Sequence, residues 1–177
     1  MPLIEETVLL LKATFPSTVN IQQQINPESH SSVINVDCPQ LQEVLINLCN
    51  NAVRAMNENG ELKISLNPVE LSQKDIPAQY YALPGNYAKI SVQDTGCGMT
   101  TEMLDKSFDP FYATKETYEG AGMGLPTVQG TVAQHGGLIT VNSVLGQGTV
   151  FDLYLPLADK EATETKPTNE DAPTFSM

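Results

Sequence analysis

Apolar and polar residues follow each other along the chain with two different periods. In residues 3–14 the apolar side chains recur at helical spacing, and Pro16 just beyond them predicts where that helix ends. Residues 18–25 (TVNIQQQI) and 31–37 (SSVINVD) instead alternate at the two-residue period of a strand. The first part of the chain is therefore expected to hold one helix followed by two strands.

A second helix is predicted from Asp37 to about Asn57. Asp37 suits the N-cap position, because its side-chain oxygen can accept a hydrogen bond from an early backbone N–H, and Pro39 suits the first turn. The apolar residues of this helix share one side and are expected to be buried: Leu41, Val44, Leu45, Leu48, Ala52 and Ala55. A polar side is left opposite them.

The rest of the chain alternates between regular and loop-like segments. Further elements are predicted as a strand in ENGELKISL, strands at 87–94, 138–144 and 148–156, and a helix at about 125–135. Residues 69–86 and the Gly-, Thr- and Pro-rich stretch 95–124 are expected to be loops, the second long enough to serve as a lid or binding loop. The expected fold class is α/β (α+β), a two-layer sandwich of a mixed, mostly antiparallel sheet with helices on one face.

Composition narrows the class of protein. The chain has 177 residues, of which 41% are hydrophobic, and no apolar run approaches the roughly 20 residues of a membrane span. Its start, MPLIEETVLLL, lacks the basic segment of a secretory signal, so we expect a cytoplasmic location. A net charge of −12 argues against a nucleic-acid partner. An anionic ligand would have to be held by backbone N–H groups, a divalent metal and a few local cations.

Cysteine usage and the C-terminal composition add two expectations. Cys38, Cys49 and Cys97 lack the spacing of metal ligands and are expected to be ordinary buried thiols. Residues 158–177 are polar and acidic with almost no large apolar side chain. They are expected to form a disordered tail or linker after a folded domain of residues 1–157.

The polar side of the second helix carries an unusual set of residues. Glu43, Asn47 and Asn51 are spaced four apart, and Arg54 continues their row one turn later. Asparagine costs up to about 0.7 kcal/mol relative to alanine in a helix. A row of one carboxylate, two amide oxygens and a cation suits a hydrated metal–phosphate pair, since magnesium prefers oxygen ligands. A solvated helix face remains the alternative.

Two glycine motifs follow. In QDTGCGM, Asp94 can accept a hydrogen bond from an amino group, while Gly96 and Gly98 allow close approach to a flat ligand. In EGAGMGLPTV, alternating glycines precede a predicted helix, and freed N–H groups at such a helix start can bind an anion. An ordinary turn and a flexible connector are the respective alternatives. Neither motif matches a P-loop or a dinucleotide fingerprint.

Two more segments accompany these motifs. In FDPFYATK, the aromatics Phe108, Phe111 and Tyr112 are expected to hold a lid onto the body, and Lys115 is one of few cations near the presumed phosphates. Core packing and a solvated lysine are the alternative. LGQGTVF predicts a tight turn into a strand, with Thr149 offering a hydroxyl group.

These segments occur in one order, and in that order the chain resembles the ATP-binding catalytic domain of sensor histidine kinases, within the superfamily that includes DNA gyrase and MutL. LQEVLINLCNNAVRAM resembles the N box, DTGCGM the G1 box, FDPFYATK the F box and GAGMGL the G2 box. HGGLITVNSVLGQGTVFDLYLP resembles the closing segment through the G3 turn. The resemblance covers roughly residues 3–157 and implies a Bergerat-type ATP-binding fold with a flexible lid.

The resemblance also implies roles for individual residues. Asn47 and Asn51 would meet magnesium and the phosphates of ATP, and Arg54 would contact a phosphate. Asp94 would bond the adenine amino group, and Lys115 would steady the phosphates. The remaining cofactor-binding residues implied are Gly96, Gly98, Gly120, Gly122, Gly124, Leu125 and Thr149. Asn50 matches no family role.

The resemblance implies the catalytic residues and the partner domains less directly. Glu43 matches a carboxylate that orients water in the related ATPases, and we expect it to be an accessory because a neutral imidazole is already nucleophilic near pH 7. The two histidines, His30 and His135, lie outside the family's acceptor motif. A dimerising acceptor-histidine domain is therefore expected elsewhere, with a receiver domain or response regulator as the further partner. The isolated domain is expected to be monomeric and the full-length kinase homodimeric.

Two other functions fit parts of the pattern. An anti-sigma-factor-type serine kinase shares the asparagine helix and the G1 motif, but it generally lacks an F box such as FDPFYATK. A nucleotide-sensing module without transfer activity would use the same binding residues. Phosphoryl transfer to an added acceptor domain separates these possibilities from a histidine kinase.

Overall fold

The computed structural model describes residues 2–31, 33–109 and 124–158. Its long helices lie where the apolar spacing predicts them: α1 at Pro2–Thr14, α2 at Cys38–Ala55 and α4 at Gly124–Gln134. Two short helices lie in connections, η1 at Pro27–Ser31 and α3 at Thr101–Asp105. Asp37 caps α2 as predicted, because its carboxylate accepts a hydrogen bond from the Gln40 N–H at 3.0 Å.

The strands form a five-stranded sheet in the order β1-β2-β3-β5-β4. Their bounds are Val19–Ile25 for β1, Gly60–Leu71 for β2, Gly85–Asp94 for β3, Leu138–Val144 for β4 and Gly148–Pro156 for β5. β1 pairs with β2 in parallel, and the other neighbouring strands pair antiparallel. The predicted mixed, mostly antiparallel sheet is confirmed.

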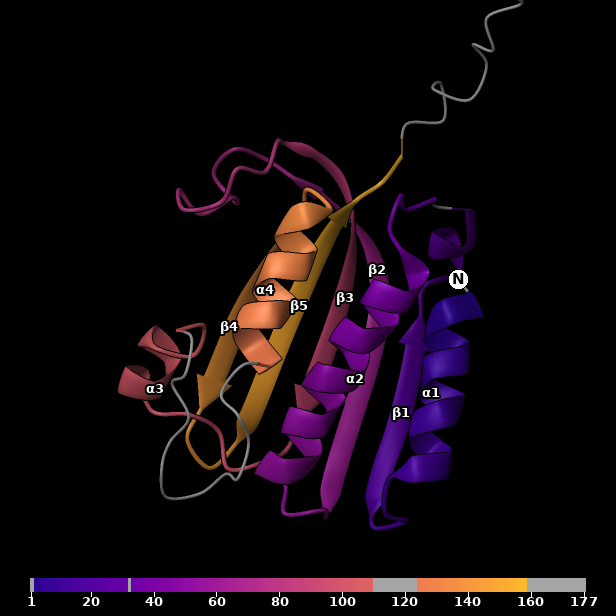
Figure 1. Ribbon diagram of the computed structural model, residues 1–177, viewed down its shortest axis with the longest axis vertical. Helices are drawn as coiled ribbons and strands as arrows, with labels where there is room; N and C mark the ends of the chain where they lie inside the picture. Colours follow the sequence, from indigo (N-terminus) through magenta and orange to yellow (C-terminus); the bar gives the residue numbers. More distant parts are fainter. Residues whose placement is uncertain (1, 32, 110–123, 159–177) are drawn as a thin grey trace, which may run out of the picture.

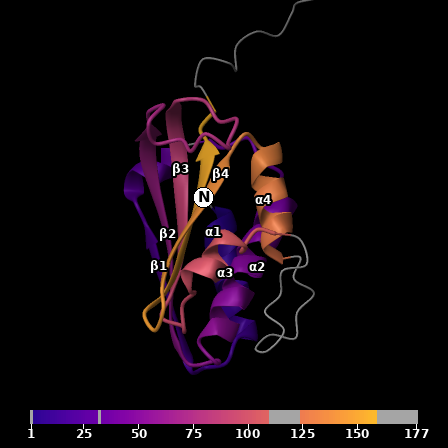
Figure 2. The same ribbon diagram turned by 90° about the vertical axis from the view of Figure 1, so that its left-hand side faces the viewer.

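Sheet and helices make two layers, with α1, α2 and α4 on the same face (Figures 1 and 2). The alternation of the strands explains this arrangement, because every second residue points to the helices. Ile64, Ile90 and Leu153 are at most 1% exposed and share one core with Leu45 and Leu48 of α2, which are fully buried. The predicted two-layer sandwich with helices on one face is therefore confirmed.

The other face of the sheet is covered at one end by the β2–β3 connection, seen at the top of Figure 1. Ile76 of this connection packs with Leu71, Tyr87 and Leu138 in a small second core. The Tyr80 hydroxyl donates to the Ile139 carbonyl at 2.5 Å and so fastens the connection to β4. This packing lies on the opposite face of the sheet from the helices.

Three expectations require correction. The strand predicted at 31–37 is absent from its described residues: η1 ends at Ser31, and over residues 33–37 Ile34 makes an isolated bridge to Leu157. The expected loop 69–86 is shorter, because β2 extends to Leu71 and β3 begins at Gly85. Of the cysteines, Cys49 is buried, but Cys38 and Cys97 are exposed.

Within the described ranges, no helix is both long and apolar enough to cross a lipid bilayer. The predicted tail beyond residue 158 lies outside those ranges.

Candidate functional site

The predicted site segments meet at one end of the sandwich. A Cβ on Gly124, the first residue of α4, would lie 3.8 Å from Nδ2 of Asn51 on α2. One turn further along α2, the Ala55 carbonyl accepts a hydrogen bond from the Cys97 N–H at 2.9 Å. The Cys97 carbonyl in turn accepts from the Gly146 N–H in the β4–β5 turn at 2.7 Å. The end of α2 thus contacts both the start of α4 and the segment after β3, at the lower end of Figure 1.

The polar row of α2 is arranged as its spacing predicts. Asn47 and Asn51 are half-buried, whereas Glu43 and Arg54 are exposed. The opposite side is buried at Leu41, Val44, Leu45, Leu48 and Ala52, while Ala55 is only half-buried. The two asparagines therefore lie at the margin of the helical layer, where an amide can reach a ligand without being exposed to solvent on all sides.

Asp94, the last residue of β3, is 3% exposed. Its Oδ1 accepts two backbone hydrogen bonds, from the Gly96 N–H at 2.7 Å and from the Thr149 N–H at 3.3 Å. Among the described residues, no hydrogen bond reaches Oδ2. The carboxylate is thus oriented by its own turn and by β5, and Oδ2 is the oxygen available to a ligand.

Burial dominates the electrostatics of this carboxylate. Desolvation raises the pKa of Asp94 above its ordinary value, and the two hydrogen bonds from Gly96 and Thr149 partly oppose that rise. A buried acceptor with one unpaired oxygen gains more from a ligand N–H than an exposed carboxylate would, because water does not compete for it.

A serine that the sequence analysis did not single out organises the far side of this site. The Ser143 hydroxyl accepts from the Met99 N–H at 2.8 Å and donates to the Gly148 carbonyl at 3.0 Å. Since its one proton is then used, the Thr149 hydroxyl, 2.9 Å away, donates to it. Thr149 is left with lone pairs that can accept from a ligand. The sequence signal that could have identified Ser143 was a polar residue at a position of the predicted strand 138–144 that points into the sandwich.

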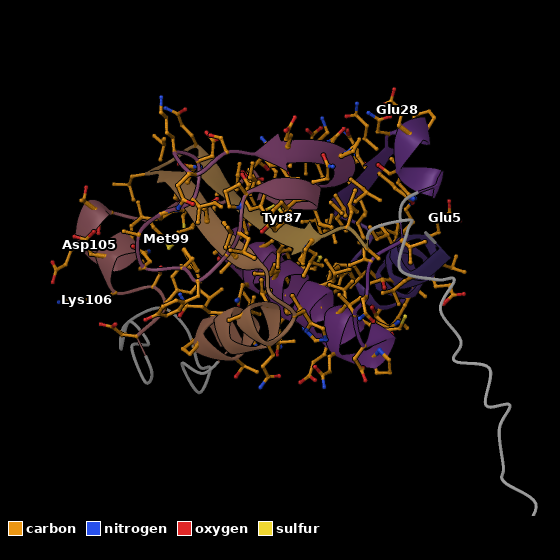
Figure 3. All side chains as sticks on the ribbon, turned by 90° about the horizontal axis from the view of Figure 1, so that it is seen from above. Glu5, Glu28, Tyr87, Met99, Asp105 and Lys106 are labelled. Atoms are coloured by element: carbon orange, nitrogen blue, oxygen red, sulfur yellow. The ribbon has the colours of Figure 1, made fainter. Side chains whose placement is uncertain are left out.

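Gly98 is required by close backbone packing. Its φ is +66°, and a Cβ there would overlap the Val144 carbonyl oxygen. Gly96 is similarly close to α2, since a Cβ would lie 2.7 Å from the backbone of Ala55. The glycines of the DTGCGM motif therefore bring the segment against α2 and the β4–β5 turn. In Figure 3, Met99 lies on the same side of the molecule as Asp105 and Lys106, away from Glu5 and Glu28.

Several predicted site residues are placed less completely. Leu125 is partly buried and packs against the main core, as does Phe108. Lys115, Gly120, Gly122, Phe111 and Tyr112 lie outside the described residues. The structure therefore brings together Asn51 with Gly124, and Asp94 with Gly96 and Thr149, while Gly98 packs against the β4–β5 turn.

The donor set fits a magnesium–phosphate pair better than a metal held by protein alone. In the described ranges, no group of three or more His, Cys, Asp or Glu side chains is placed to hold a metal ion. The α2 row instead offers the amide oxygens of Asn47 and Asn51, both half-buried on one face of the helix. Magnesium usually keeps several waters and takes a few protein oxygens together with substrate phosphates.

Three features define a nucleotide-binding α/β sandwich: a buried carboxylate at the end of a strand, a row of asparagines on α2, and a glycine as the first residue of α4. Residues 36–159 match the family described as Histidine kinase-, DNA gyrase B-, and HSP90-like ATPase. The chain belongs to this family of ATP-binding domains.

Its relatives include sensor kinases. The chain is 38% identical over 130 residues to Sensor kinase CckA of Brucella abortus, covering 70% of this chain and 13% of that protein. It is 32% identical over 159 residues to Signal transduction histidine-protein kinase AtoS of Escherichia coli, covering 88% of this chain and 23% of that protein. The chain therefore corresponds to less than a third of each of these relatives.

The fold also matches solved histidine kinase structures. The catalytic domain of histidine kinase ThkA in a nucleotide-free form superposes with a TM-score of 0.67 at 26% identity, covering 88% of this chain and 90% of that one. Full-length ShkA in complex with AMPPNP gives a TM-score of 0.65 at 24% identity, covering 89% of this chain and 30% of that one, and supports the fold.

Proposed function

We propose that this chain is the catalytic ATP-binding domain of a two-component sensor histidine kinase. It binds Mg-ATP and supports transfer of the γ-phosphoryl group to a histidine on a dimerising domain. The observation that carries the proposal is the convergence of three features at one end of the family's fold. These are the asparagine row of α2, the buried Asp94 carboxylate and the glycine start of α4.

Different residues among those described bind the adenine and the phosphates. Asp94 Oδ2 accepts from the exocyclic amino group of adenine, while Thr149 offers lone pairs from the neighbouring start of β5. Asn47 and Asn51 supply amide oxygens toward the phosphates and magnesium, and Arg54 adds a cation one turn later. A magnesium ion held there would supply positive charge to offset the negative charge that develops on the transferred phosphoryl group. Lys115, Gly120, Gly122 and Leu125 are proposed to complete the phosphate side.

The protein's contribution to the reaction is then mainly positioning. Asn51 of α2 lies beside Gly124 at the start of α4, so the asparagines that meet the phosphates are held on packed helices. Glu43 lies exposed on the same row, two turns before Asn51. We assign it an accessory role, because a neutral imidazole attacks without a strong general base.

The partners follow from this assignment. The acceptor histidine belongs to a dimerisation domain, and the phosphoryl group passes on to a receiver domain or response regulator. The working protein is a homodimer with its catalytic domains in the cytoplasm, while residues 1–157 form the domain and 158–177 a linker.

Labelled ATP tests the proposal. The chain is mixed with the separately purified acceptor-histidine domain of the same protein and γ-labelled ATP, and acid-labile, alkali-stable label on the acceptor is measured. Label on histidine that disappears with the Asn51→Ala variant supports the proposal. Tight ATP binding without label on any histidine would refute it in favour of a nucleotide-sensing module, and label on serine would favour the serine kinase.

A further inference from the structure

His135 joins the two site helices at the end opposite the nucleotide site. α2 and α4 run antiparallel, because Gly124 at the start of α4 lies beside Asn51 near the end of α2. At the other end, the ring of His135, just after α4, accepts a hydrogen bond from the Asp37 N–H at the N-cap of α2, with a length of 3.2 Å. Figure 1 shows α2 and α4 side by side in this antiparallel arrangement.

The contacts of the ring determine which nitrogen carries the proton. A backbone N–H can only donate, so Nε2 of His135 must be the unprotonated, accepting nitrogen. Nδ1, which lies 2.8 Å from the Thr131 carbonyl oxygen, must then carry the proton and donate it. Each ring nitrogen therefore satisfies a backbone group at a helix end that has no partner within its own helix.

These contacts fix the far end of α4. Val128 and Val132 bury the middle of the helix in the core, and beyond them Gly136 turns the chain with φ +70°. The hydrogen bond from the Asp37 N–H to the His135 ring links this turn to the cap of α2. α4 is only 11 residues long, so Gly124 and the turn that holds His135 lie at the two ends of one short, packed helix.

We propose that His135 is a positioning residue for nucleotide binding: its neutral Nδ1–H tautomer fastens the end of α4 to the cap of α2, and protonation of the ring releases that tie. This inference rests on the proposed function. A protonated ring has a donor on both nitrogens, so Nε2 would face the Asp37 N–H donor to donor. Histidine is the side chain whose ordinary charge change falls between pH 5 and 8, so a pH series over this range tests the tie.

The neighbouring groups steer the protonated ring away from the amide. The Asp37 carboxylate, which accepts from Gln40, is the acidic group on the α2 side, with the Cys38 thiol next to it. α4 and β4 contain no titratable residue. β5 contributes Tyr154 and Asp152, and the latter pairs with Lys89 at 2.9 Å. A cationic ring is drawn to the Asp37 carboxylate, which replaces the amide contact and disturbs the cap of α2.

The tautomer is tested directly by nitrogen-detected NMR on ¹⁵N-labelled protein. His30→Gln leaves His135 as the single histidine signal in this chain. At pH 8 we expect a protonated Nδ1, an unprotonated Nε2 and a coupling across the hydrogen bond between Nε2 and the Asp37 amide nitrogen. A ring protonated at Nε2 at pH 8, or the absence of that coupling, would overturn the assignment.

The effect of His135 on nucleotide binding is tested with Mg-ADP from pH 8 to pH 5.5. At each pH the dissociation constant of His135→Phe is divided by that of wild type. The ratio cancels titration of the nucleotide. At pH 8 we expect the variant to bind about twofold to tenfold more weakly, the range for loss of one net hydrogen bond. As the pH is lowered and the wild-type ring becomes protonated, the ratio should fall towards one, because wild type then loses the same contact.

The outcomes separate the two proposals. A ratio that is constant with pH, or equal to one at pH 8, would refute the role of His135 while leaving the proposed function in place. Wild-type protein that binds no Mg-ADP at pH 8 would refute the proposed function itself. If His135→Phe does not fold, the same pH series is run with His135→Asn, whose amide can accept from Asp37 but does not titrate. The wild-type dissociation constant divided by that of His135→Asn should then rise as the pH falls, and a ratio constant with pH would refute the role of His135.

Discussion

Replacing Asp94 by asparagine should change which nucleotide base the protein prefers. Two N–H donors, from Gly96 at 2.7 Å and Thr149 at 3.3 Å, point at Oδ1. In the Asp94→Asn variant the carbonyl oxygen of the new amide must take that place, because its NH₂ group would face two donors. The NH₂ group therefore replaces Oδ2, the atom proposed to accept from adenine. An acceptor becomes a donor at the ligand position, with the backbone bonds retained.

The size of the change follows from the chemistry of that one contact. A hydrogen bond to a charged group contributes about 1.5–3 kcal/mol, so ATP binding should weaken roughly 10- to 150-fold. Guanine carries an acceptor oxygen where adenine carries its amino group, so GTP should bind the variant better than it binds wild type. Calorimetric titration of both proteins with Mg-ATP and Mg-GTP measures the two ratios. A variant that keeps the wild-type preference for ATP over GTP refutes the assignment of Asp94.

The same substitution should not destabilise the fold. Burial raises the pKa of Asp94, so the folded protein holds a proton there more tightly than the unfolded chain. This contribution to stability is fully present below the unfolded pKa of about 3.9 and is lost as pH rises through the folded value. Asp94→Asn removes the buried charge, so its Tm at pH 7 should equal or exceed that of wild type, and the difference should shrink below about pH 4.

Asp152→Asn is the matched control. Asp152 is also buried, at 6% exposure, but it pairs with Lys89 at 2.9 Å and accepts from the Ser91 hydroxyl at 2.5 Å, on the face of the sheet away from the helices. Its replacement should lower the Tm and leave the affinities for ATP and GTP unchanged. Equal losses of ATP affinity in the two variants would show that general destabilisation, rather than base recognition, explains the result.

Three further predictions concern single positions. Asn51→Ala should abolish magnesium-dependent ATP binding with little change in Tm, whereas the neighbouring variant Asn50→Ala should bind ATP normally. Normal ATP binding by Asn51→Ala would contradict the assignment of Asn51 to the site. Gly98→Ala should lower the free energy of unfolding by about 2–4 kcal/mol, because φ is +66° and the Cβ would overlap the Val144 carbonyl. Gly130→Ala has open space around it and should raise the free energy of unfolding by about 0.5–1 kcal/mol. Denaturant titration measures both values. A thiol reagent at pH 8 should label Cys38 and Cys97 but not Cys49, because Cys49 is buried and burial raises the pKa of its thiol to about 12. Mass spectrometry of labelled peptides checks this, and fast labelling of Cys49 in the folded protein contradicts it.

Strand prediction failed where the alternating pattern had no partner to pair with. Residues 31–37 alternate as β1 does, yet they do not pair with the outer edge of β1, where the sheet ends. Ile34 reaches only the Leu157 end of β5, through one bridge. A two-residue period shows that a segment can form a strand, but hydrogen-bonding partners decide whether it does.

The cysteine prediction failed for a similar reason. Cysteine is on average among the most buried residue types, and that average describes Cys49 on the inner side of α2. Cys38 occupies the first turn of the same helix, and Cys97 lies in the turn after β3, where its backbone makes hydrogen bonds to Ala55 and Gly146. Exposure at a helix start or in a turn depends on neighbours that composition does not specify.

The sequence by itself determined the three long helices, most strands, the family and the residue types of the site, because helical period, N-cap chemistry and the order of short motifs are local properties. Only the tertiary structure decided how those residues act. The raised pKa of Asp94 depends on burial, and its orientation depends on Thr149, 55 residues away. The tautomer of His135 depends on Asp37, 98 residues away. Burial and the choice between donor and acceptor are set by atoms brought together in the fold, and no local pattern contains them.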